Sequence, residues 1–238
     1  GRISSRKLHN LLATDSPKVF RQNKSCETNS AAITLLVDQS GSMGNGRLAL
    51  ARQIAILFAE TLNQLRIPSE IIGFTTQNPW QFRKVSGIEY QAEQGDLSAQ
   101  YARLVPVEYT LFKGFHEPFK FLKERLPAML ASWHTPLDEA VLFAGKRLAL
   151  RPELRKIILV LTDGEPYTGN PTMQRAVELH LEQNLDRLND AQIECIAIGI
   201  QTDYVKRFFH EYIVVYNLAE LPRAFYSKFS ELLRRTKS

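Results

Sequence analysis

Side chains that carry oxygen follow one apolar segment of the sequence at intervals of two residues. Asp38, Ser40 and Ser42 come directly after the apolar, β-branched run 33–37, in the segment ITLLVDQSGSMGNG. Such a run, stopping abruptly at a polar loop, is typical of a buried strand. Side chains two positions apart in an extended loop project to the same side, so one carboxylate and two hydroxyls should converge. These hard oxygen ligands suit Mg²⁺, with Mn²⁺ or Ca²⁺ as alternatives.

This spacing resembles the metal-ion-dependent adhesion site of von Willebrand factor A (vWA) domains, where a threonine and an aspartate from later loops complete the set. Thr135 in HTPL and Asp163 in LTDG stand at matching positions. The resemblance implies one Mg²⁺ held by Ser40, Ser42 and Thr135. Asp38 and Asp163 would ligate it directly or through water. It further implies an exchangeable position on the ion that a carboxylate of a partner protein can take.

The loop after Asp38 has other interpretations. Residues 41–48 come close to the phosphate-binding pattern G-x-x-x-x-G-K-[ST], but Arg47 replaces the lysine and Leu48 has no oxygen to hold Mg²⁺. A hydrolase with Asp38 as its nucleophile would need a second acid two residues on, where Ser40 stands. A polar turn without any ligand is the third alternative, because Ser, Gly and Asn are ordinary turn residues.

Strand and helix patterns alternate along the chain around these residues. The sequence predicts strands over 33–37, 69–74, 156–162, 194–200 and 212–216, and helices over 47–66, 117–131, 136–148, 171–188, 203–209 and 221–233. Thr135 followed by proline is also typical of a helix N-cap, so its hydroxyl could serve either the helix or a metal.

Alternating strands and helices predict an α/β fold: a Rossmann-like, doubly wound, mostly parallel sheet with helices on both faces. Right-handed crossovers place the carboxyl ends of all parallel strands at one edge. Open α/β sheets bind their ligands at that edge, and Asp38, Asp163 and the loop before Thr135 all fall there.

Length and charge divide the chain of 238 residues into a basic arm and one domain. Residues 1–30 hold six basic and two acidic residues, so this arm carries +4 of the net charge of +5. A solvated linker is the simplest interpretation, and nucleic-acid binding is not favoured because only Phe20 lies among the basic residues. Residues 31–238 form the predicted vWA-like domain. Scattered Gly, Pro and aromatic residues predict an ordered insertion at about 75–115, either a packed excursion or a partner-facing element.

Composition also bears on the setting of the protein. No apolar window is long enough for a membrane span, so none is predicted. Cys26 and Cys195 form neither a disulfide framework nor a metal-spaced pair, which favours the cytoplasm. The five histidines have no ligand spacing. Since the chain starts at Gly1 rather than at methionine, we expect a fragment of a longer protein.

Further segments narrow the resemblance. YTLFKGFHEPFKF at 109–121, and the combination of LLVDQSGSM, IIGFTT and LTDGEP, are similar to the C-terminal domain of the CobT subunit of aerobic cobaltochelatase, from the arm to the terminal helix. The resemblance implies a non-catalytic subunit of an ATP-dependent ligase that forms nitrogen–metal bonds. That subunit bridges an AAA+ ATPase and a large tetrapyrrole-binding subunit, for cobalt insertion into hydrogenobyrinic acid a,c-diamide in cobalamin biosynthesis. A D-type subunit of magnesium chelatase, and a vWA scaffold or adhesion module without an ATPase, are the alternatives.

Overall fold

The computed structural model describes residues 31–78, 106–169 and 171–217. By its internal contacts the chain divides into Gly1–Ser30 and Ala31–Ser238, and all described residues belong to the second unit. The predicted basic arm, most of the predicted insertion at 75–115 and the predicted terminal helix at 221–233 lie outside the described residues.

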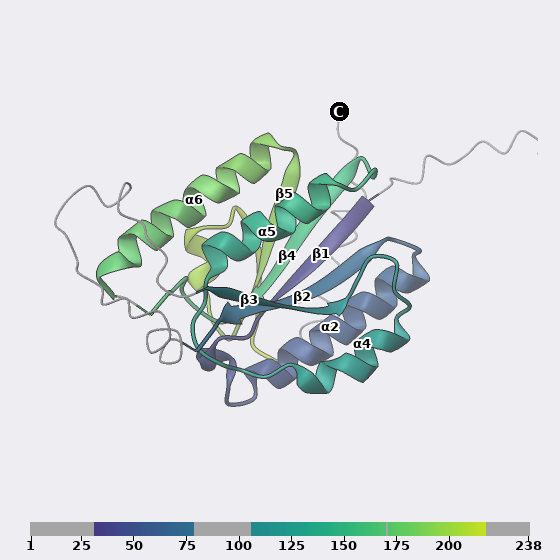
Figure 1. Cartoon of the computed structure of the whole chain (residues 1–238), viewed down its shortest axis with the longest axis horizontal. Coiled ribbons are helices and arrows are strands. Elements are labelled where there is room, and N and C mark those ends of the chain that lie inside the picture. Colours follow the sequence, from purple (N-terminus) through teal and green to yellow (C-terminus); the bar gives the residue numbers. More distant parts are fainter. Residues whose placement is uncertain (1–30, 79–105, 170, 218–238) are drawn as a thin grey trace, which may run out of the picture. The chain divides into compact units, whose positions relative to one another are not determined.

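A six-stranded sheet with the strand order β3-β2-β1-β4-β5-β6 forms the centre of the domain (Figure 1). All neighbouring strands are parallel except β2 and β3, which are antiparallel. Every residue of β1 and β2 is buried, as expected for a parallel sheet covered on both faces. The strands are β1 (Ala31–Asp38), β2 (Ser69–Thr76), β3 (Val107–Lys113), β4 (Arg155–Thr162), β5 (Ile193–Ile200) and β6 (Glu211–Val215).

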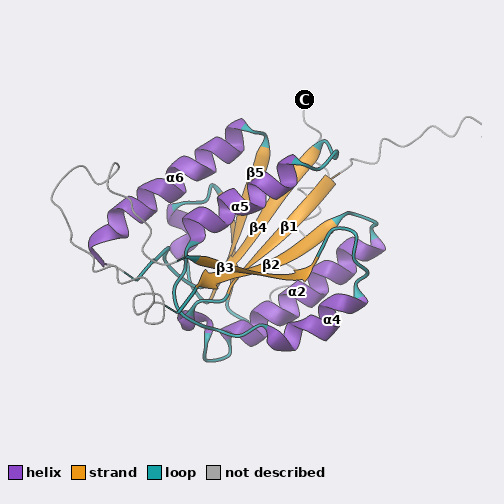
Figure 2. Ribbon diagram, in the orientation of Figure 1, coloured by secondary structure: helices purple, strands orange, loops and turns teal. Residues whose placement is uncertain are grey.

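Helices cover both faces of the sheet. α2 (Arg47–Gln64) and α4 (Lys120–Arg125) lie on one face, and α5 (Leu137–Ala149) and α6 (Gln174–Asp190) on the other (Figure 2). Because side chains alternate along a strand, Leu35 of β1 packs in the core beneath α2 and Leu36 in the core beneath α5. The predicted doubly wound α/β fold is therefore confirmed.

The structure differs from the sequence prediction in three places. The helix predicted over 203–209 is a short 3₁₀ helix, Tyr204–Arg207. β3 lies inside the range 75–115 predicted as an insertion, so the last part of that range belongs to the sheet. The helix predicted over 117–131 is shorter: α4 ends at Arg125 and a 3₁₀ turn, Leu126–Ala128, follows. Pro127 lies in this turn and cannot donate the backbone hydrogen bond that an α-helix would need there.

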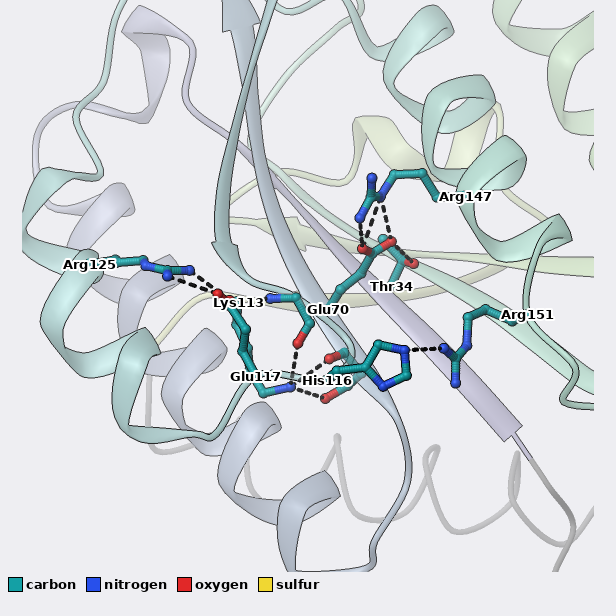
Figure 3. Close-up of polar contacts among 10 residues, drawn as sticks. Thr34, Glu70, Lys113, His116, Glu117, Arg125, Arg147 and Arg151 are labelled. Carbon is teal, nitrogen blue, oxygen red and sulfur yellow. Dashed lines mark hydrogen bonds and ion pairs between the residues drawn. The ribbon is translucent and has the colours of Figure 1, made fainter.

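A buried carboxylate ties α5 to the sheet. Glu70 of β2 is fully buried and accepts hydrogen bonds from the Thr34 hydroxyl at 2.9 Å and from Arg147 Nε and Nη2 at 3.0 and 2.8 Å (Figure 3). Arg147 belongs to α5, so its guanidinium links that helix to two central strands. Among the described residues, no helix is long and apolar enough to cross a membrane.

Candidate metal centre

The loops after β1 and β4 begin side by side. Val37 pairs with Leu161 in the parallel sheet, so Asp38 and Thr162 leave it together. The Asp38 side chain is fully buried; its Oδ1 accepts the Ser40 N–H at 2.8 Å and its Oδ2 accepts the Thr162 hydroxyl at 2.6 Å. These two bonds fix the orientation of the carboxylate. A buried carboxylate held in this way is poorly placed as a nucleophile, which disfavours the hydrolase alternative.

Burial also changes the acidity of Asp38. Desolvation raises the pKa of the Asp38 carboxyl from its ordinary 3.8 to about 7, and the nearby Asp163 adds to the rise. Hydrogen bonds from Thr162 and Ser40 act in the opposite direction and lower the pKa. Positive charge close to this carboxyl, such as that of a divalent cation, would favour its ionised form.

Hydroxyl and carboxylate oxygens form a chain across the two loops. Ser40 Oγ lies 3.0 Å from Ser42 Oγ, and Ser42 Oγ donates to Asp163 Oδ1 at 2.8 Å. Ser42 belongs to a short 3₁₀ helix, Gly41–Met43, whose N-cap is Ser40; no side-chain hydrogen bond caps this helix. The structure thus brings together the two serines and the aspartate that the sequence singled out, and neither serine hydroxyl is used in capping.

Thr135 lies in the loop before α5, which is joined by backbone hydrogen bonds to the loops after β1 and β4. Its backbone pairs with Tyr167 in the loop after β4, with N–H···O distances of 2.8 and 2.9 Å. The preceding loop bonds to the one after β1, because Gly41 N–H donates to the Trp133 carbonyl at 2.9 Å. Thr135 therefore joins the other four candidate residues through its loop rather than through a side-chain hydrogen bond.

The predicted capping role of Thr135 is wrong. α5 begins at Leu137 with Pro136 as its N-cap, and no side-chain hydrogen bond caps the helix. Thr135 lies one position before this N-cap. Its backbone pairs instead with Tyr167 in an isolated β-bridge. Of its two predicted uses, helix capping is thereby removed and metal binding stays a prediction.

Two residues near the site have roles that sequence reasoning missed. Thr162 orients Asp38, as described above. Arg47, the first residue of α2, donates from Nη1 to Asp163 Oδ2 at 2.8 Å and to the Ser42 carbonyl at 3.1 Å. The sequence pattern singles out Arg47 only as a substitute for a phosphate-binding lysine. Arg47 begins the helix that directly follows the Ser42 loop, and this position could have indicated that it lies near the site.

The donor set fits a hard divalent cation. The candidate ligands offer three hydroxyls and two carboxylates, which suit Mg²⁺ better than soft or nitrogen-binding metals. Within the described residues, no group of three or more His, Cys, Asp or Glu side chains could hold a metal ion. Ser40, Ser42 and Thr135 would hold Mg²⁺ through their hydroxyls. Both oxygens of Asp38 and both of Asp163 accept hydrogen bonds, so each carboxylate would ligate either directly or through water.

Comparison with known proteins agrees with this architecture. A family model described as the VWA domain of the cobalamin biosynthesis protein CobT matches residues 19–235. Among solved structures, the vWF domain of the type V pili tip protein Mfa5 from Porphyromonas gingivalis has a TM-score of 0.62 at 11% identity, covering 89% of this chain and 98% of that one.

Two further solved structures share the fold. The PilB minor pilin from Streptococcus sanguinis has a TM-score of 0.59 at 12% identity, covering 90% of this chain and 64% of that one. A von Willebrand factor type A protein from Catenulispora acidiphila has a TM-score of 0.53 at 13% identity, covering 86% and 42%. At such low identity these likenesses establish the vWA fold alone.

Proposed function

The chain belongs to the family of VWA domains of CobT, a cobaltochelatase subunit of cobalamin biosynthesis, and from this premise we propose that it couples an AAA+ ATPase to cobalt insertion into hydrogenobyrinic acid a,c-diamide. In this proposal the chain is a non-catalytic part of the chelatase and cobalt is the substrate of the assembly. The large tetrapyrrole-binding subunit carries the insertion chemistry. The assembly works in the cytoplasm, where ATP is present for the ATPase.

The metal part of the proposal depends on one observation: the chain of oxygens from Ser40 through Ser42 to Asp163, beside the buried Asp38. We assign Ser40, Ser42 and Thr135 as hydroxyl ligands of Mg²⁺, with Asp38 and Asp163 ligating directly or through water. The bound ion supplies positive charge at an edge of the domain that a carboxylate of a partner subunit can approach.

The residues of this chain hold and orient that site rather than carry out a reaction. Thr162 and the Ser40 N–H fix the Asp38 carboxylate, and the Trp133 carbonyl holds the loop at Gly41. An Asp or Glu of the ATPase or of the tetrapyrrole-binding subunit docks at this edge. Rearrangements of the ATPase ring reach the metal-inserting subunit through that contact.

Titration with Mg²⁺ tests the metal assignment. The chain with Asp38→Ala and Ser40→Ala together should bind Mg²⁺ at least tenfold more weakly than wild type in isothermal calorimetry, since a carboxylate and a hydroxyl ligand are lost. Thr61→Ala is a matched control, because its hydroxyl donates to the Leu57 carbonyl inside α2, away from the site. Equal Mg²⁺ affinity in the double variant and wild type would refute the assignment.

Reconstitution of the three-component chelatase tests the coupling role. Ser42→Ala or Asp163→Ala should give a folded domain that retains less ATPase in pull-down and supports less cobalt insertion. Wild-type insertion rates in these variants would show that the metal site is not used. Insertion of magnesium into a porphyrin instead of cobalt would favour a D-type magnesium chelatase subunit, and the lack of any ATPase partner would favour a scaffold module.

A further inference from the structure

Arg47 lies beside two of the candidate metal ligands, Ser42 and Asp163. Its Nη1 contacts Asp163 Oδ2 at 2.8 Å and the Ser42 carbonyl at 3.1 Å, and its Nε contacts Gln201 Oε1 at 3.3 Å. The Asp163 side chain is fully buried, whereas the Arg47 side chain is 35% exposed. The guanidinium therefore spans from a buried ligand oxygen to the surface of the protein.

Part of this guanidinium is open to a further ligand. Arginine offers five N–H donors in one plane, of which Nε carries one and each terminal nitrogen two. Contacts to Gln201, Asp163 and Ser42 account for the donors of Nε and Nη1. Within the described part of the chain, no hydrogen bond from Nη2 is found, and the Arg47 side chain as a whole is 35% exposed. Nη2 is part of a charged group and can donate to one oxygen of a carboxylate.

The charge of Arg47 changes the balance of the site. The carboxylates of Asp38 and Asp163 together neutralise a divalent cation, so the guanidinium leaves one positive charge in excess once the cation is bound. That excess weakens the attraction for the cation, because the two positive charges share Asp163. The same excess strengthens the attraction for an incoming carboxylate.

We propose that Arg47 is a second binding point for the partner carboxylate beside the proposed Mg²⁺, and that it favours the acidic ligand at the expense of metal affinity. This inference rests on the proposed function and adds a residue to it. A carboxylate docked here contacts the metal position with one oxygen and Nη2 of Arg47 with the other. A neutral amide side chain gains neither charge interaction, so the site distinguishes glutamate from glutamine.

The alternative role for Arg47 is a brace that only holds the loops in place. The two roles predict opposite effects on Mg²⁺ binding. Loss of a brace disorders the ligands and weakens Mg²⁺ binding and carboxylate binding together. Loss of a competing charge strengthens Mg²⁺ binding while it weakens carboxylate binding.

Two titrations of the whole chain separate these roles. In isothermal calorimetry with Mg²⁺ alone, Arg47→Gln should bind the ion more tightly than wild type, on the order of tenfold. In NMR titration at saturating Mg²⁺, a short peptide with a single glutamate should bind Arg47→Gln on the order of tenfold more weakly than wild type. The same peptide with glutamine should bind neither protein measurably. Arg66→Gln, an equal charge change in an exposed residue just beyond α2, should match wild type in both titrations.

Arg47→Lys supplies a second readout that keeps the charge but removes the planar donors. It should bind Mg²⁺ as wild type does and bind the glutamate peptide at least threefold more weakly. If Arg47→Gln does not fold, this variant decides, and unchanged peptide affinity overturns the proposal.

The outcomes distinguish this inference from the proposed function beneath it. Wild-type protein that binds no Mg²⁺ overturns the metal site and the inference with it. Wild-type protein that binds Mg²⁺, with Arg47→Gln unchanged or weaker toward the ion, leaves the metal site standing and overturns the role of Arg47 alone.

Discussion

Ser42 Oγ donates a hydrogen bond to Asp163 Oδ1 over 2.8 Å and so joins two loops that lie 121 residues apart in the chain. The second carboxylate oxygen of Asp163 accepts a bond from Arg47 at 2.8 Å. One aspartate therefore links the loop after β1, the loop after β4 and the first residue of α2. We expect the charge of Asp163 to affect Mg²⁺ affinity and its hydrogen bonds to affect the unfolding free energy. Two different substitutions can test these effects one at a time.

Asp163→Asn should lower Mg²⁺ affinity at least tenfold while the protein stays folded, because the amide keeps an acceptor oxygen for Ser42 but has no charge. Asp163→Ala should in addition cost about 1 kcal/mol of unfolding free energy, since it removes the hydrogen bonds from Ser42 and Arg47, whose donors remain accessible to water. Calorimetric titration and chemical denaturation measure the two effects. Asp190→Asn, an equal charge change at the exposed end of α6, should alter neither; a similar Mg²⁺ loss in this control would point to general electrostatics.

Substitutions of Thr135 can test whether its side chain binds the metal or caps α5. Thr135→Val should weaken Mg²⁺ binding and leave the unfolding free energy nearly unchanged, because the side chain does not cap α5. A capping threonine would lose about 1 kcal/mol on the same change. Thr135→Ser, which keeps a hydroxyl, should retain Mg²⁺ binding. If Thr135→Val binds Mg²⁺ as wild type does, Thr135 is not a ligand.

Much of the fold could be predicted from local pattern. The run 33–37 indicated a strand buried on both sides, and β1 is buried along its whole length. The edge strand β3 could not be placed, because residues 107–113 follow a stretch rich in Gly, Pro and aromatic residues and, among the described strands, pair with β2 alone. Local sequence does not show which strand such a segment joins.

Some residues of the candidate site could likewise be predicted from local sequence, and others could not. Spacing alone placed Asp38, Ser40 and Ser42 together, since all three belong to one loop. Arg47 and Thr162 were missed because their partners come from other loops: Arg47 reaches Asp163 across 116 positions, and Thr162 reaches Asp38 across 124. Such contacts depend on the crossover connections of the sheet, which set which loops are neighbours.

The ion pair between Glu70 and Arg147 is expected to contribute to the unfolding free energy of the domain (Figure 3). Arg147→Ala should destabilise the domain strongly, because it removes the ion-pair partner of the fully buried Glu70 carboxylate and leaves that carboxylate the Thr34 hydroxyl as a hydrogen-bond donor. Breaking one side of a buried ion pair costs about 3–5 kcal/mol, and the lower end applies here because Arg147 is 38% exposed. Chemical denaturation measures the loss. Glu70→Gln in the Arg147→Ala background should recover part of it, and no recovery would show that lost packing rather than the stranded charge is responsible.

The ion pair between Glu117 and Arg125 is expected to make the stability of the domain depend on pH (Figure 3). Hydrogen bonds from Arg125 Nη1 and Nη2 at 2.7 and 2.9 Å, and one from Gly114 N–H at 2.7 Å, lower the pKa of Glu117 from its ordinary 4.5 to about 2. A carboxyl whose pKa is lower in the folded state binds fewer protons there than in the unfolded chain. Its contribution to stability is therefore fully present above about pH 4.5 and is lost as the pH falls toward 2.

Glu117→Gln should accordingly be less stable than wild type near neutral pH, and the difference in unfolding free energy should shrink as the pH falls through that range. Urea denaturation at a series of pH values measures the difference. In an Arg125→Gln background, Glu117→Gln should produce a smaller and flatter difference, because the main cause of the lowered pKa is gone. A difference between Glu117→Gln and wild type that stays constant from neutral pH to about pH 2 would mean that Arg125 and Glu117 are not paired in solution.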